Sequence, residues 1–288
     1  MDLMSKIKTF FRLIKFEHSI FALPFAYLGL FLAEDGLPRF SVFFWVTVAM
    51  ISIRTAGMCL NRIIDRRIDA KNPRTKDRRV ALQFLSLKVI WFVTVLALVI
   101  FIGSAFQLNS LCFYLSPIVI ALVWVYPHFK KFTWCSHFIL GMILGIAPYA
   151  GWLASTGRFG WLPFPLMISV ASWVSGFDMF YALQDVEFDR REHLKSFPAV
   201  FGVNQTLKMV RLLHAITVLS LAYFGLAAAM GFWYWTGWLV IVGLILKEHN
   251  LVARFGLSKI NEAFFNMNAW VSAVIFIAVA LQLTLSQS

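Results

Sequence analysis

Nine runs of mostly apolar residues, most of them close to 20 residues long, constrain what this chain can fold into. A helix needs about 20 apolar residues to cross a bilayer, where its backbone must be hydrogen-bonded internally. Charged residues make up 14% of the chain, against about a quarter in soluble domains. We therefore expect an all-α membrane protein whose residues 1–288 form a single integral-membrane domain. The runs cover 17–34, 41–60, 87–106, 110–127, 135–155, 162–183, 209–229, 231–247 and 266–285.

The seventh and eighth runs are barely separated, so eight helices remain an alternative to nine. The distribution of basic residues favours nine. With the N-terminus inside, 23 of the 26 Lys and Arg residues fall on inner segments, whereas Arg39 and Arg158 fall outside and Arg54 lies within a run. Inner loops of membrane proteins carry such an excess. We expect a multi-pass protein of a bacterial inner membrane, with a cytoplasmic N-terminus and an external C-terminus.

The net charge of +12 follows from the same asymmetry. It does not indicate a nucleic-acid partner, because the basic residues form no continuous soluble face. Basic and apolar residues alternate over residues 6–15, which predicts an amphipathic helix on the membrane surface.

Carboxylates follow two of the apolar runs at equivalent places. Asn61, Asp65 and Asp69 follow the second run at intervals of four, which places them on one face of a helix. Asp185 and Asp189 follow the sixth run with the same interval. The second and sixth runs are equivalent members of two successive four-run units. We therefore expect two four-helix pseudo-repeats and an added ninth helix, with a site where the halves meet.

Paired carboxylates beside basic residues are typical of a Mg²⁺ and diphosphate site. Mg²⁺ binds through one or two carboxylates and completes its shell with water and phosphate oxygens, while Arg and Lys neutralise the remaining phosphate charge. A diphosphate on a long hydrocarbon would explain so apolar a protein. The expected metal ligands are Asn61, Asp65, Asp69, Asp185 and Asp189, and the expected diphosphate-binding residues are Asn61, Arg62, Arg74, Arg78, Lys130 and Lys131.

Two ionisable residues lie inside apolar runs. Asp178 lies about two turns into the sixth run and, with Tyr181, Asp185 and Asp189, is expected to line one stripe of a helix. Arg54 lies seven residues before the first motif, on its face. Ionisable groups at such depth are costly and usually face a polar cavity. A structural ion pair between Arg54 and Asp178 is the alternative.

These segments resemble the UbiA superfamily of intramembrane prenyltransferases. RTAGMCLN (54–61), Asp65, Asp69 and NPRT (72–75) look like its first signature, and YALQD (181–185), Asp189 and KSFP (195–198) resemble its second. Tyr126-Pro127 with Lys130-Lys131 resembles the loop between helices four and five. FEHSIFALP (16–24) is similar to the branch that includes 4-hydroxybenzoate polyprenyltransferases and their menaquinone-pathway relatives. Arg62 departs from the pattern, because many members have Asp there.

The resemblance implies a helical bundle around a central cavity open towards lipid. It implies Mg²⁺-dependent transfer of a polyprenyl group from polyprenyl diphosphate to an aromatic acid, 4-hydroxybenzoate first, in ubiquinone or menaquinone biosynthesis. The implied catalytic residues are Asp65, Asp69, Asp185, Asp189 and, as proton acceptor or cation stabiliser, Asp178; Arg54 and Tyr181 would bind the aromatic acid. A naphthoate or futalosine-pathway precursor is an alternative acceptor. A secondary transporter is the alternative of another class.

Overall fold

Helices make up all the regular structure in the described residues of this computed structural model, which are 3–15, 17–75, 78, 81, 84–256 and 260–285. Residue 16 and the side chains of residues 17–21, which carry part of the N-terminal resemblance, lie outside this description. The helices are α1 (Leu3–Leu13), α2 (Glu17–Glu34), α3 (Phe40–Lys71), η1 (Pro73–Thr75), α5 (Leu87–Leu108), α6 (Ser110–Phe132), α7 (Ser136–Thr156), α8 (Phe164–Ala182), η2 (Leu183–Asp185), α9 (Val186–Arg191), α10 (Phe197–Ala227), α11 (Phe232–Phe255) and α12 (Ile260–Leu285).

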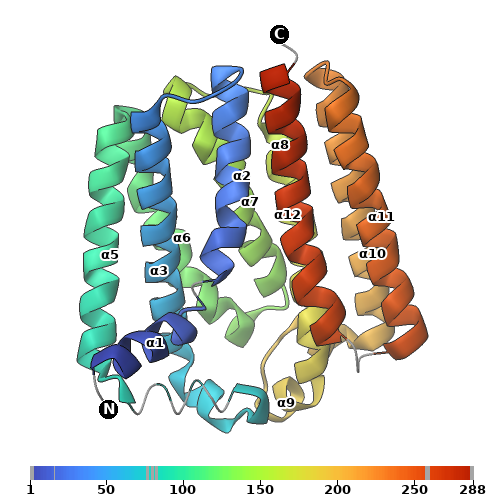
Figure 1. Ribbon diagram of the computed structural model, residues 1–288. Helices are drawn as coiled ribbons and strands as arrows, with labels where there is room; N and C mark the ends of the chain where they lie inside the picture. Colours follow the sequence, from blue (N-terminus) through green and yellow to red (C-terminus); the bar gives the residue numbers. More distant parts are fainter. Residues whose placement is uncertain are drawn as a thin grey trace.

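The long helices stand side by side in one bundle, and α1 lies across the end at which α9 also lies (Figure 1). Within the described residues, α3, α5, α6, α7, α10, α11 and the segment Phe164–Arg191 are long and apolar enough to cross a membrane. The apolar stretches described in α2 and α12 are shorter, at Ala22–Glu34 and Trp270–Leu285. The all-α membrane fold is therefore confirmed, while the count of nine spans stays a prediction.

Helix ends depart from the predicted runs mainly where polar residues continue a helix. The second run was expected to end near residue 60, but α3 continues to Lys71 and ends just before Asn72-Pro73. The proline ring disfavours the α conformation at the residue before it. Asn72, which precedes Pro73, is accordingly extended, with φ −81° and ψ 120°. As a result, the first acidic motif lies on the same continuous helix as the apolar span.

The seventh and eighth runs form two separate helices, α10 and α11. The helix α10 begins at Phe197, well before residue 209, and its backbone breaks at Gly202, where φ is 80°. Glycine adopts this conformation without the steric cost that a Cβ would add.

Small residues allow α7 to approach two neighbours closely. A Cβ on Gly29 of α2 would lie 1.7 Å from the Pro148 carbonyl oxygen, and a Cβ on Gly151 of α7 would lie 1.9 Å from that of Ala26. On the α8 side, a Cβ on Gly141 would lie 2.0 Å from Ser175 Oγ. Helices in lipid associate through such close packing, because lipid tails are as apolar as leucine. The glycines therefore fix α7 between α2 and α8.

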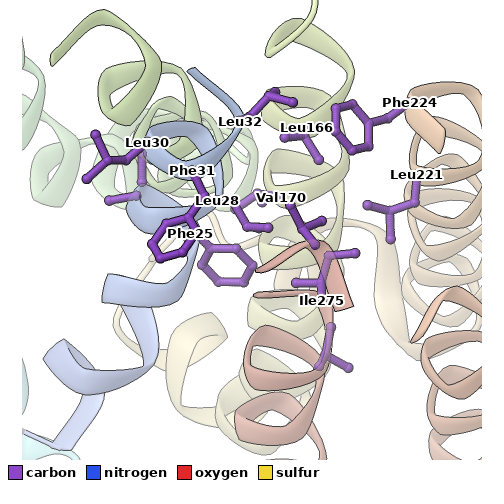
Figure 2. Packing of buried hydrophobic residues seen from close by; sticks show 14 of the residues in the cluster. Phe25, Leu28, Leu30, Phe31, Leu32, Leu166, Val170, Leu221, Phe224 and Ile275 are labelled. Atoms are coloured by element: carbon purple, nitrogen blue, oxygen red, sulfur yellow. The ribbon is translucent and has the colours of Figure 1, made fainter. Parts of the chain in front are cut away.

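The main apolar core lies beside this contact and joins α2 and α8 to α10, α11 and α12. Figure 2 shows Phe25, Leu166, Leu221 and Ile275 converging within it. The core includes a pocket of about 280 Å³, counting the space that opens outwards, lined mainly by apolar side chains. None of the acidic motif residues lines this pocket. The central cavity expected for a hydrocarbon tail therefore stays a prediction.

Adding a methyl group at the α2–α7 contact should destabilise the protein. Gly29→Ala forces a Cβ against backbone, and overpacking typically costs about 1–3 kcal/mol. We expect the detergent-solubilised variant to melt several degrees below the unchanged protein. Gly103→Ala on α5 is the matched control, because no atom would lie within 4 Å of its Cβ. Equal melting temperatures for the two variants would contradict the described helix contact.

Candidate functional site

The first acidic motif lies on one face of α3. Asn61 Nδ2 donates a hydrogen bond to Asp65 Oδ2 at 3.0 Å. Asp65 is 2% exposed and Asp69 is 5% exposed. Buried carboxylates are strongly unfavourable unless cations or hydrogen-bond donors compensate them.

Basic residues from other segments provide that compensation. Lys130 Nζ of α6 pairs with Asp65 Oδ2, and Arg78 donates from Nη1 to Asp69 Oδ1 at 3.0 Å. Arg62, which stands where many family members have Asp, is also buried, with 2% of its surface exposed. Its Nη1 lies 3.5 Å from Asp69 Oδ2, and its Nε donates to the carbonyl oxygen of Leu13 at 3.2 Å. Arg62 therefore joins the motif to the end of α1.

The second acidic motif does not continue α8 as a straight helix. The helix α8 ends at Ala182, and the chain passes through η2 into the short helix α9. Tyr181 and Asp185 both contact Arg74 across this turn, and the predicted single stripe from Asp178 to Asp189 stays a prediction. Asp189 is 9% exposed and accepts a hydrogen bond from Ser196 Oγ at 2.5 Å.

Residues that follow the first motif bind the second. Asn72 Nδ2 donates to Asp185 Oδ1 at 3.0 Å. Arg74 Nε donates to the same oxygen at 2.8 Å, and its Nη2 pairs with Asp185 Oδ2. The Arg74 guanidinium also lies 4.5 Å from the centre of the Tyr181 ring. This bidentate pair and cation–π contact bring the segment that follows the first motif against the second motif.

The electrostatics of Arg74 reflect this contact. Burial acts to lower its pKa, but Asp185 and Tyr181 together outweigh burial through hydrogen bonds and charge, so the pKa lies above its ordinary value. A second ion pair crosses between the motifs beside it, with Lys71 Nζ 2.6 Å from Glu192 Oε2. Both pairs tie the end of α3 to the segment around α9.

Two carboxylate oxygens of the first motif are available to bind a metal ion. Asp65 Oδ1 and Asp69 Oδ2 are buried without a hydrogen-bond partner. Across the part of the chain that the structure describes, no three His, Cys, Asp or Glu residues form a ready-made metal-binding group. Mg²⁺ commonly takes one or two carboxylates and retains water and phosphate ligands. The donor set therefore fits Mg²⁺ that is shared with a phosphorylated ligand.

Deeper in the bundle, Asp178 pairs with His137 of α7, whose Nδ1 lies 2.6 Å from Asp178 Oδ2. The alternative ion pair between Arg54 and Asp178 is therefore wrong. Arg54 Nε is buried without a hydrogen-bond partner. Tyr126 of α6 interacts electrostatically with both Arg54 and Asp178, and also with Asp65, so it links the deeper residues to the first motif.

Sequence reasoning missed His137, since a lone histidine near a helix start carries no spacing signal. Its partner on α8 emerges only from the packing of α7 against α8. Lys131 was predicted together with Lys130. Both lie at the end of α6, but within the described residues only Lys130 pairs with a motif carboxylate.

This bundle of apolar helices, with two acidic motifs joined at one end, is that of an intramembrane prenyltransferase. Residues 22–272 match the UbiA prenyltransferase family, and the chain belongs to that family. A 4-hydroxybenzoate octaprenyltransferase of Francisella tularensis subsp. mediasiatica is 27% identical over 281 residues, covering 96% of this chain and 98% of the relative. The enzyme of that name from Nitrosomonas europaea is 27% identical over 285 residues, covering 98% and 97%.

Two solved structures share the fold. A UbiA homologue from Aeropyrum pernix K1 in its apo form has a TM-score of 0.84 and 30% identity, covering 92% of this chain and 98% of that one. A UbiA homologue from Archaeoglobus fulgidus bound to GPP and Mg²⁺ has a TM-score of 0.70 and 20% identity, covering 93% and 99%. The second likeness concerns the fold alone.

Removing Arg62 should destabilise the protein, because it would leave the buried Asp69 with less compensation and the Leu13 carbonyl without its donor. Removing one partner of a buried ion pair typically costs about 3–5 kcal/mol. We expect Arg62→Met to lower the melting temperature in detergent markedly. Arg66→Met is the matched control, because Arg66 is exposed on the same helix. A melting temperature for Arg62→Met equal to that of the control would contradict the described burial of this residue.

Proposed function

We propose that this protein transfers a polyprenyl group from polyprenyl diphosphate to a ring carbon of an aromatic acid, with 4-hydroxybenzoate as the acceptor, in ubiquinone or menaquinone biosynthesis. One observation carries the proposal: Asn72 and Arg74, which follow the first acidic motif, bind Asp185 of the second. The motifs thus form one charged site at the end of an apolar bundle. The names of the curated relatives and the GPP and Mg²⁺ bound to the Archaeoglobus homologue support this choice of substrates.

The carboxylates of both motifs are the proposed Mg²⁺ ligands. Asp65 and Asp69 each have an oxygen free of hydrogen bonds, and Asp185 and Asp189 would add ligands from the second motif. The Asn61 amide oxygen, which accepts a hydrogen bond from Arg62, would turn to the metal. Bound Mg²⁺ would stabilise the negative charge that develops on the departing diphosphate.

The basic residues of the site are proposed to bind the diphosphate. Arg74, Arg78 and Lys130 each hold a motif carboxylate in this structure. Phosphate oxygens are equally good acceptors for these donors, so the side chains can exchange a carboxylate for the substrate. Arg62 is buried between Asn61 and Asp69, and it would act chiefly by holding the motif. Lys131 is not paired with a motif carboxylate in this structure. It would add positive charge to the diphosphate site.

The deeper residues are proposed to receive the acceptor. Arg54 has a buried Nε without a partner, and a planar guanidinium binds a carboxylate in bidentate fashion. Tyr181 packs under Arg74 of the proposed diphosphate site and would contact the acceptor from that side. The surrounding apolar helices would exclude water, which would otherwise capture the allylic cation.

The sequence analysis also left two kinds of alternative, other aromatic acceptors and a secondary transporter. A naphthoate or a futalosine-pathway precursor would also present a carboxylate to Arg54, so a panel of acids in the assay separates these acceptors. A secondary transporter would place its charged site near the bilayer midplane, whereas the motifs here meet at one end of the bundle.

Removing one charge from either motif should abolish most turnover. Purified protein is supplied with labelled polyprenyl diphosphate, Mg²⁺ and 4-hydroxybenzoate, and prenylated product is measured. We expect Asp65→Asn and Asp185→Asn each to lower kcat by at least about 100-fold, the scale on which one electrostatic group acts. Asp35→Asn is the control, because Asp35 is exposed on a connection far along the chain from both motifs and should leave kcat unchanged.

Chelator should remove the activity and Mg²⁺ should restore it. Turnover at the full rate without a divalent ion would contradict the metal-dependent mechanism. Loss of activity in only one of the two Asp variants would contradict a shared site.

Removing Arg54 should impair use of the aromatic acid selectively. Losing one partner of a buried charged pair typically costs 2–5 kcal/mol, or about tens to thousands of fold in affinity. We expect Arg54→Ala to raise KM for 4-hydroxybenzoate at least about tenfold, with little change in KM for the diphosphate. Arg158→Ala, at an exposed position, should change neither constant. A stable Arg54→Ala protein impaired only towards the diphosphate would place Arg54 in the leaving-group site instead.

A further inference from the structure

The pair formed by His137 and Asp178 is held by the closest part of the α7–α8 contact. A Cβ on Gly141 would lie 2.0 Å from Ser175 Oγ, and a Cβ on Gly145 would lie 2.7 Å from the Met167 carbonyl oxygen. His137 lies one turn before Gly141, and Asp178 lies three residues after Ser175, so both continue the same antiparallel contact. The helix packing therefore fixes where these two side chains meet.

The hydrogen bond between them leaves one imidazole nitrogen available. His137 Nδ1 lies 2.6 Å from Asp178 Oδ2. An ionised carboxylate only accepts hydrogen bonds, so Nδ1 carries the proton, and in a neutral ring Nε2 then keeps a lone pair. His137 is 6% exposed, and its Nε2 is buried without a partner. A buried polar atom without a partner is unfavourable, so this nitrogen is suited to bind a ligand.

The charged neighbours of this pair belong to both parts of the proposed site. Asp178 contributes from α8, and Tyr126 of α6 interacts electrostatically with Asp178 and with Arg54 of α3. From α9, Asp189 interacts electrostatically with His137. His137 therefore belongs to one charged group with a carboxylate of the second motif and with the residues that would receive the acceptor.

We propose that His137 Nε2 is the base that removes the ring proton of the aromatic acceptor, with Asp178 as the positioning residue that sets its tautomer. The inference rests on the proposed function. The ring carbon next to the hydroxyl-bearing carbon bonds to C1 of the prenyl group, while the C1–O bond breaks and leaves its electron pair on diphosphate. The proton on that ring carbon passes to Nε2, and the C–H electron pair restores aromaticity. The Asp178 carboxylate stabilises the imidazolium formed.

The decisive variant is His137→Asn. The Asn amide nitrogen can still donate to Asp178, which preserves the contact between α7 and α8, but the side chain has no basic nitrogen. We expect kcat to fall at least about 100-fold, the usual scale of general base catalysis, with both KM values nearly unchanged. His193→Asn removes an exposed histidine and should leave kcat unaltered.

Deuterium on the reacting ring carbon separates a chemical role from a structural one. When proton removal becomes slow, deuterated 4-hydroxybenzoate should react more slowly than the ordinary acid, so the isotope effect on kcat should be larger in His137→Asn than in the unchanged protein. Asp178→Asn should show the same increase, because an amide that donates to Nδ1 forces the proton onto Nε2.

An active His137→Asn protein, or one that loses kcat without an increased isotope effect, would overturn the role of His137 while leaving the proposed function in place. Failure of the unchanged protein to prenylate any aromatic acid would instead overturn the proposed function, and this inference with it.

Discussion

Pairing of buried carboxylates with basic residues is the interaction on which the site depends. An unpaired charge in a water-poor region costs several kcal/mol, so each carboxylate must find a partner when no substrate is present. The partners come from separate segments: Lys130 of α6 for Asp65, Arg78 for Asp69, and Arg74 of η1 for Asp185. The same pairs therefore hold the segments together and gather positive charge where the proposed function needs a diphosphate.

Helix packing determines how the ionisable residues deeper in the bundle are paired. Glycines bring α7 within backbone contact of α2 and α8, and that approach lets His137 reach Asp178. Since Asp178 is thereby satisfied, Arg54 keeps its guanidinium Nε without a partner. Close packing between apolar helices thus leaves one guanidinium nitrogen and one imidazole nitrogen without hydrogen-bond partners. The two roles proposed for the acceptor, binding its carboxylate and removing its proton, follow from this single arrangement.

The fold class and the first motif could be predicted from the sequence, because apolar length and four-residue spacing are local properties. Asn61, Asp65 and Asp69 lie on α3 as their spacing predicts. The second motif was predicted less well, since nothing in Tyr181-Ala182-Leu183-Gln184-Asp185 signals that α8 ends at Ala182. The partners of Asp178 and Asp185 could not be predicted either, because they depend on which helices are neighbours. Likewise, the basic residues were predicted as phosphate ligands, whereas the structure pairs four of them, Arg62, Arg74, Arg78 and Lys130, with carboxylates.

Cross-linking tests most directly whether the two acidic motifs belong to one site. Lys71 and Glu192 pair beside it at 2.6 Å, so cysteines at these positions should be joined by a short bismaleimide in intact membranes. Cys112 and Cys135 are replaced by alanine beforehand, while the buried Cys59 remains. We expect rapid cross-linking of Lys71→Cys with Glu192→Cys within one chain, and slower cross-linking in the presence of Mg²⁺ and a prenyl thiodiphosphate analogue. Cysteines that each react with a monofunctional maleimide but never cross-link would contradict a shared site.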